Sequence, residues 1–274
     1  MFDKEAIEAL QYGGGIQEAS SAVIEAYTSH KLVSLPNHFT LHDLEKFMPN
    51  RRRARGMMET SSIQDFALYV TRNAEAGATV FVSGKSMVAN AVLNLGTPGT
   101  PGHADNRAQI KPDTTAAYAA LRAVAQGQAL DQTQVAEFLE DWAPHISCFK
   151  DEGEVTLKHA IAAVRNITIE GLRKVEASEQ QLSASKSTFE AVTASSKDPL
   201  PTTIYFRCEP YQGFENRLFV MRLGIRTSDK PAITLRIVNV ELHEEQMAQE
   251  LADKVRAAVD DACPVLIGDY TGRP

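Results

Sequence analysis

The chain has 274 residues, of which 43% are hydrophobic and 23% are charged, and its formal net charge at pH 7 is −7. These proportions belong to a folded globular protein and exclude a disordered or fibrous chain. Three cysteines, Cys148, Cys208 and Cys263, lie far apart in the sequence, which argues against a zinc site and a disulfide framework. Residues 1–30 carry charges at short intervals, and no run of about 18 apolar residues occurs. We therefore expect a cytoplasmic protein without a signal peptide or membrane partner.

The first predicted elements are two short helices over residues 3–27. Apolar residues recur there at helical intervals, and the three glycines at 13–15 indicate a hinge. The glycine run lacks the spacing of a phosphate-binding loop and does not follow a strand. His38 and His42 have acidic neighbours but no HExxH motif, so we expect no metal ligand and no cofactor.

A β-hairpin is predicted in the centre of the chain. A helix starting at Ile63 precedes it, with serines at the capping positions. Strand-forming residues then occupy 79–83 and 87–95, and a run rich in glycine and proline separates them from 103–111. Most hairpin loops have about two to five residues, so this long tip suggests a contact with another subunit. The candidate contact residues are Gly96, Pro98, Pro101 and Gly102.

Helices are predicted to follow the hairpin. An alanine-rich amphipathic helix covers 114–125, and Asp131 with Gln134 forms a capping-box pattern that opens a second helix. A third apolar stripe begins near residue 154, but its second half has equally good strand propensity.

The C-terminal part is predicted to be an antiparallel meander followed by a helix. Strand-like runs cover 202–208, 217–226 and 232–240, and residues 244–261 carry one apolar stripe at helical spacing. The predicted class is therefore α+β: a central β-hairpin with helices, and a C-terminal antiparallel sheet backed by a long helix. Residues 183–201 are poor in hydrophobic residues, which favours a division into 1–182 and 183–274, with one single domain as the alternative.

A cluster of four arginines is the first candidate binding feature. It comprises Arg51, Arg52, Arg53 and Arg55. Guanidinium groups in such a cluster can pair with phosphates or with a partner's carboxylates. A solvated loop, or ion pairs with nearby acidic residues, explains the cluster equally well.

The second candidate binding feature is one face of the meander. Residues 201–240 contain six basic and three acidic residues, so the net charge of this segment is positive, whereas that of the whole chain is negative. Period-two alternation places four of the basic residues and one tyrosine on the face opposite the core: Arg207, Arg222, Arg226, Arg236 and Tyr205. Arginines for phosphates and an aromatic ring for stacking are typical of sheets that bind single-stranded nucleic acid. Oligomer interfaces are also enriched in Arg and Tyr, and the net charge of −7 weakens the nucleic-acid interpretation.

No catalytic residue can be assigned from the sequence. His103 beside Asp105 could act as a base, but no nucleophile is tied to the pair by spacing. A metal-dependent enzyme would need both residues to converge with Glu140 and Asp141, a spacing that fits no nuclease motif. No cysteine has His and Asn partners at a recognisable spacing.

Several runs, taken in order, carry a family resemblance. They are residues 91–96 with 101–105, then 138–141, 222–226 and 235–238. Together they resemble the YfdQ-like family of temperate-phage and prophage proteins, uncharacterised in function, over about residues 35–268. Where relatives commonly carry an acidic residue at the end of the hairpin's first strand, this chain has Asn94. The resemblance therefore assigns no catalytic residue; it implies a phage or prophage gene, expressed in a bacterial host near genes for DNA replication and recombination.

These observations favour a non-enzymatic phage accessory protein. We expect it to self-associate and to bind nucleic acid, or a host or phage protein, through its arginine-rich surfaces. One alternative is a structural ring or shell built through the 96–102 tip. The other is a metal-dependent enzyme acting on nucleic acid.

Overall fold

The computed structural model describes residues 4, 21, 45–150, 153–167, 200–226 and 232–272. The chain divides into two compact units, Met1–Ala54 and Arg55–Pro274. In the first unit the structure describes one 3₁₀ turn, η1 (Glu45–Phe47). Of the helices predicted at 3–27, residues 4 and 21 alone are described, and the boundary predicted at 183 lies outside the described residues. The second unit holds both sheets and is described below.

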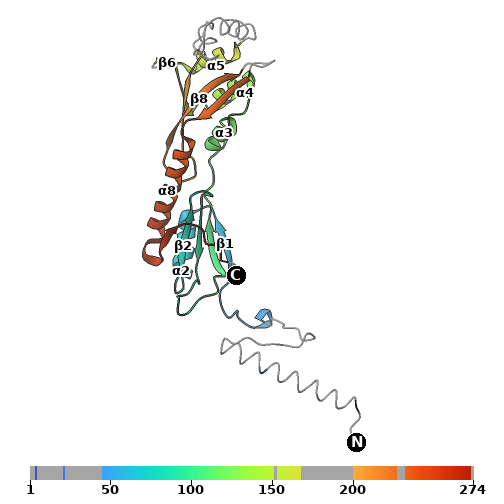
Figure 1. Cartoon of the computed structure of the whole chain (residues 1–274), viewed down its shortest axis with the longest axis vertical. Coiled ribbons are helices and arrows are strands. Elements are labelled where there is room, and N and C mark those ends of the chain that lie inside the picture. Colours follow the sequence, from blue (N-terminus) through green and yellow to red (C-terminus); the bar gives the residue numbers. More distant parts are fainter. Residues whose placement is uncertain are drawn as a thin grey trace, which may run out of the picture. The chain divides into compact units, whose positions relative to one another are not determined.

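The first sheet of this unit has five strands (Figure 1). Their order is β1 (Gly56–Thr60), β4 (Asn106–Ile110), β3 (Val88–Val92), β2 (Thr79–Ser83) and β10 (Val265–Ile267). The three central strands are antiparallel, which confirms the predicted hairpin and its extension to β4. Both edge strands pair in parallel with their neighbours, β1 with β4 and β10 with β2. Helix α2 (Ile63–Asn73) packs on β1 and β4. Its first turn is capped as predicted, because the Ser62 hydroxyl accepts a hydrogen bond from the Asp65 backbone N–H.

The tip between β3 and β4 folds back on its own backbone. Gly96 forms a bridge with Pro101 and has a φ of +75°, where a side chain would be strained. A Cβ at Gly96 would collide with the backbone at Gly102, and a Cβ at Gly102 would collide with the Asn94 carbonyl. These two glycines are therefore needed inside the subunit, whatever the exposed residues of the tip contact.

The second sheet is antiparallel throughout. Its order is β6 (Gly153–Val155), β5 (Ile146–Lys150), β7 (Thr203–Cys208), β8 (Arg217–Arg226) and β9 (Ala232–Ile237). The predicted meander is confirmed as β7–β8–β9. The sequence analysis did not identify the hairpin of β5 and β6, which adds two strands on the β7 side.

Three predicted helices are confirmed beside the second sheet. They are α3 (Ala116–Val124), α4 (Gln132–Asp141) and α5 (Leu157–Arg165), with the 3₁₀ turn η2 (Ala143–His145) after α4. The Asp131 capping box opens α4 as predicted. Tyr118 of α3 stacks on Phe219, and Phe138 of α4 stacks on Phe206, so both helices cover the apolar face of the sheet.

The long C-terminal helix α8 (Val240–Val259) contacts both sheets (Figure 1). Its first half meets β8, where the His243 ring lies 4.7 Å from the Phe219 ring. It also packs against α2, β2 and β10, burying Leu251, Val255 and Val259. The 3₁₀ turn η3 (Asp260–Ala262) then leads into β10.

The structure has a mixed α+β architecture, as the sequence predicts. Its core includes fully buried residues of both sheets and their helices, among them Phe66, Val80, Phe206 and Phe219. Among the helices that the structure describes, none is long and apolar enough to cross a lipid bilayer.

Candidate functional site

Alternation along the meander strands is confirmed. Ile204, Phe206 and Cys208 of β7 are buried, whereas Arg207 is exposed and Tyr205 half-buried on the opposite face. The same pattern leaves Arg222 of β8 and Arg236 of β9 exposed between buried neighbours. Of the predicted face residues, Arg226 lies opposite Ala232 in the register, and its side chain is outside the described part.

The register places two of these arginines directly opposite each other. Arg222 pairs with Arg236, and Thr203 is the partner of Arg222 on the other side. Like charges at directly opposite positions of an antiparallel pair are destabilising. Within the described residues, no acidic side chain pairs with either guanidinium. This pair therefore concentrates uncompensated positive charge on the last two strands of the sheet, β8 and the edge strand β9.

An aromatic pair lies on the same face. Tyr205 pairs with Ser147 of β5, so Phe149, two residues on, shares its face and is opposite Thr203. The ring centroids of Phe149 and Tyr205 are 4.7 Å apart. Sequence analysis missed Phe149 because it did not identify β5, although Ile146, Cys148 and Phe149 gave a strand-like signal. We call this set the arginine face: Phe149, Tyr205, Arg207, Arg222 and Arg236.

The other predicted binding residues lie elsewhere. Arg51 and Arg52 are exposed and Arg53 is half-buried, all in the first unit, where the Arg52 backbone N–H donates to Glu45 Oε1 at 3.0 Å. Arg55 opens the second unit and is exposed. A binding role for this cluster stays a prediction.

The hairpin-tip residues divide into two groups. Pro98 and Pro101 are exposed, and the turn between them is held by hydrogen bonds joining Thr97 and Thr100. Gly96 and Gly102 pack on the subunit's own backbone, as described above. An oligomer contact at the tip stays a prediction.

Asn94 has a structural role beside this tip. Its amide donates to Asp105 Oδ1 at 2.8 Å, and its side-chain oxygen accepts from the Asn106 backbone N–H at 3.0 Å. These bonds connect the end of β3 to the start of β4. Among the described residues, no three His, Cys, Asp or Glu side chains gather as metal ligands would. Glu140, one of the residues an enzyme would need, instead pairs with Arg165 at 2.7 Å.

All three cysteines are buried. Burial raises the pKa of Cys148 and of Cys208 to about 12 and raises that of Cys263. A thiol becomes nucleophilic as the thiolate, so these cysteines stay unreactive near neutral pH in the folded protein.

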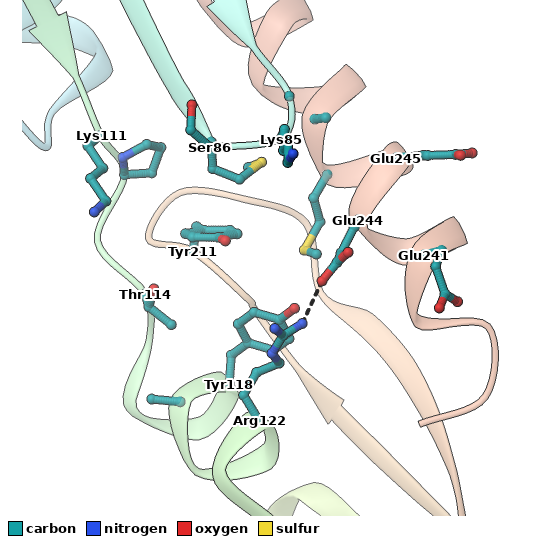
Figure 2. Close-up of a pocket in the computed structure, with 16 residues that line it drawn as sticks. Lys85, Ser86, Lys111, Thr114, Tyr118, Arg122, Tyr211, Glu241, Glu244 and Glu245 are labelled. Carbon is teal, nitrogen blue, oxygen red and sulfur yellow. Dashed lines mark hydrogen bonds and ion pairs between the residues drawn. The ribbon is translucent and has the colours of Figure 1, made fainter. Parts of the chain in front are cut away.

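A cleft of about 720 Å³ is a second candidate site, which the sequence analysis did not find. Five segments line it: the β2–β3 turn, the chain after β4, helices α3 and α8, and the β7–β8 loop (Figure 2). Lys85, Ser86 and Lys111 form one wall, and the rings of Tyr118 and Tyr211 lie below them. No motif signals this site because its residues come from five separate segments.

An ion pair closes the side of the cleft opposite the lysines. Arg122 of α3 donates to Glu244 of α8 at 2.6 Å. Desolvation raises the pKa of Tyr118 and of Tyr211, and Arg122 partly offsets the effect at both. Both phenols therefore stay protonated at neutral pH and can donate hydrogen bonds.

The chain belongs to a family of uncharacterized conserved proteins, DUF2303, whose model matches residues 5–270. No curated protein and no solved structure matches it.

Proposed function

We propose that the protein binds single-stranded nucleic acid through the arginine face. The observation that carries this proposal is the pairing of Arg222 with Arg236 on the face that also holds the tilted ring pair of Phe149 and Tyr205. Phosphates would relieve the repulsion between the two guanidinium groups, and unstacked bases would pack on the aromatic rings. Two arginines directly opposite each other lower the stability of the sheet, and such unfavourable local arrangements are expected at functional sites.

The family resemblance supports a biological setting for this activity. A YfdQ-like phage or prophage protein expressed in the bacterial cytoplasm, near replication and recombination genes, would meet single strands there. We therefore propose a phage accessory role, without assigning a reaction to the protein. Self-association through the exposed prolines of the 96–102 tip is part of the same proposal, and light scattering on a variant with a shortened tip tests it: the measured mass should fall.

Fluorescence anisotropy with a labelled oligothymidylate of about 20 nucleotides tests the binding proposal. Arg222→Ala/Arg236→Ala should weaken binding at least about tenfold, since two phosphate contacts are lost. The slope of log K against log salt should become shallower by about 1.4, because each contact on a single strand contributes about 0.7. Tyr205→Ala should weaken binding by about 1–3 kcal/mol through lost stacking.

The matched control removes two positive charges away from the arginine face. Arg72 on α2 and Lys158 on α5 are both exposed. Arg72→Ala/Lys158→Ala should leave both the affinity and the salt slope close to those of the unchanged protein. Equal losses in the two double variants, or no binding at low salt, would contradict the proposal.

A further inference from the structure

The cleft beside the tyrosines has the size of a small-molecule site. Its volume of about 720 Å³ lies within the range of about 300–1,000 Å³ that such sites occupy. Of its lining residues, none belongs to the arginine face. A ligand bound here would therefore be additional to a strand bound on the sheet.

Two ammonium groups give one wall of the cleft its charge. Lys85 lies in the β2–β3 turn and Lys111 follows β4, with Ser86 between them in the view of Figure 2. Within the part of the chain that the structure describes, neither lysine ammonium group has a hydrogen-bonding or ion-pair partner. The wall is therefore positive in a chain whose net charge is −7.

Among the described residues, no ion pair joins the acidic residues of α8 to this wall. Glu244 is already paired with Arg122. Glu241 and Glu245 also line the cleft, on its α8 side and away from the two tyrosine rings in the view of Figure 2.

The tyrosines provide an aromatic surface next to the positive wall. Tyr118 is 3% exposed and is held by stacking on Phe219 at 5.2 Å. Tyr211 is half-buried, its ring centroid is 5.9 Å from that of Tyr118, and Phe214 supports it from the loop at 5.3 Å. The ring of Tyr211 is thus fixed in position and can stack on a planar ligand.

We propose that this cleft binds a nucleoside phosphate, with the base on Tyr211 and the phosphate between Lys85 and Lys111. The Ser86 hydroxyl can donate a further hydrogen bond to the phosphate. The same chemical group occurs in a free nucleotide and at the 5′-phosphorylated end of a strand. The strand-end version rests on the proposed nucleic-acid binding, whereas the free-nucleotide version stands without it.

Isothermal titration calorimetry on the full chain tests this site with adenosine and thymidine monophosphates, the two nucleosides and ribose 5-phosphate. We expect at least one nucleotide to bind at least about tenfold more tightly than its nucleoside and than ribose 5-phosphate, since each lacks one of the two interactions. Lys85→Ala and Lys111→Ala should each weaken nucleotide binding about fivefold or more. Lys158→Ala, an exposed lysine on α5, is the matched control and should leave affinity unchanged.

The variants keep this proposal separate from the nucleic-acid proposal. Arg222→Ala/Arg236→Ala should not change the affinity for a free nucleotide. Binding of a 5′-phosphorylated oligonucleotide that falls in Lys85→Ala/Lys111→Ala, while binding of the unphosphorylated strand does not, would identify a strand end as the ligand. If neither nucleotide nor 5′-phosphate is recognised, or if recognition survives Lys85→Ala/Lys111→Ala in a protein with unchanged circular dichroism, the proposal is overturned.

Discussion

At the residue scale, the contact between Arg217 and Glu250 joins β8 to α8. The guanidinium lies 2.8 Å from the carboxylate, and the two side chains are only 15% and 12% exposed. Arg217 also donates to the Gln246 side chain at 2.9 Å, and Glu250 accepts from the Glu215 backbone N–H at 2.8 Å. Because both charges are largely removed from water, Arg217 depends on Glu250 for compensation, whereas Glu250 also meets the Lys254 ammonium group at 3.6 Å.

We predict that Glu250→Ala lowers the free energy of unfolding by about 2–4 kcal/mol, because it leaves the Arg217 charge largely buried and unpaired. Urea unfolding followed by circular dichroism measures this change. Asp253→Ala breaks an ion pair on the same helix, but Arg256 and Asp253 are 49% and 58% exposed, so its cost should be below about 1 kcal/mol. Similar losses of unfolding free energy in the two variants would show that burial does not determine how much the Arg217–Glu250 ion pair stabilises the protein.

Gly77 lies where the backbone approaches the start of the hairpin tip. Its φ is +76°, and a Cβ on it would collide with the Gly96 carbonyl. Gly127 has nearly the same φ, +74°, but open space around it. We predict that Gly127→Ala costs about 1–2 kcal/mol from backbone strain alone, whereas Gly77→Ala costs at least about 2 kcal/mol more. Thermal unfolding of both variants compares them, and equal costs would exclude the close approach as the reason for glycine at 77.

At the element scale, α4 and α5 differ in how they begin. Asp131 accepts from the Gln134 backbone N–H at 2.8 Å, and the Gln134 side chain accepts from the Asp131 N–H at 3.0 Å. Thr156 stands at the same position of α5 but makes no capping bond. Asp131→Ala should therefore destabilise the protein by about 1 kcal/mol, and Thr156→Ala by much less. Denaturant unfolding measures both, and a comparable loss at Thr156 would contradict this assignment of the cap.

Elements with strong local patterns were predictable from the sequence. The alternation in β7, β8 and β9 correctly separated buried residues such as Phe219 from exposed ones such as Arg222. The capping pattern at Asp131 and the spacing of Met247, Leu251 and Val255 gave the helices in the same way. Local sequence was sufficient there because period and capping are set within one element.

Elements that depend on distant partners were not predictable. Strand β10 has three residues and pairs in parallel with β2, far earlier in the chain. Strand β1 likewise depends on β4. The cleft has the same origin, since Lys85, Lys111 and Tyr211 meet only through the packing of both sheets with α8. No spacing within the sequence predicts that these three residues line one cleft.

At the scale of the whole described fold, several ionisable groups are buried in their neutral forms. Burial raises the pKa of Cys148 and of Cys208 from 9.0 to about 12, and it also raises that of Tyr118. The pKa of His243 is lowered, first by burial and then by the charge of Arg217. Each of these shifts favours the uncharged form of the group in the folded protein.

The free energy of unfolding should therefore be highest between about pH 7 and 8.5. Above about pH 9 the unfolded chain loses thiol protons that the folded protein retains, so stability falls as pH rises, by up to about 1.4 kcal/mol per pH unit for each thiol. On the acid side, the unfolded chain protonates this histidine near the ordinary pKa of 6.5, whereas the half-buried His243 of the folded protein resists protonation, so stability falls as pH drops. Urea unfolding at a series of pH values measures both limbs.

The Cys148→Ala/Cys208→Ala variant isolates the alkaline limb. Removing two buried thiols should lower stability at pH 7.5, because each substitution leaves a small cavity. It should also flatten the decline of the free energy of unfolding between pH 9 and 10.5, since neither the folded nor the unfolded variant then has those thiol protons to lose. Loss of packing lowers the free energy of unfolding at every pH, whereas loss of the thiols changes its slope above pH 9. Loss of packing alone therefore cannot mimic loss of titration. A variant that is less stable by the same amount at every pH would show that the thiols do not cause the alkaline decline.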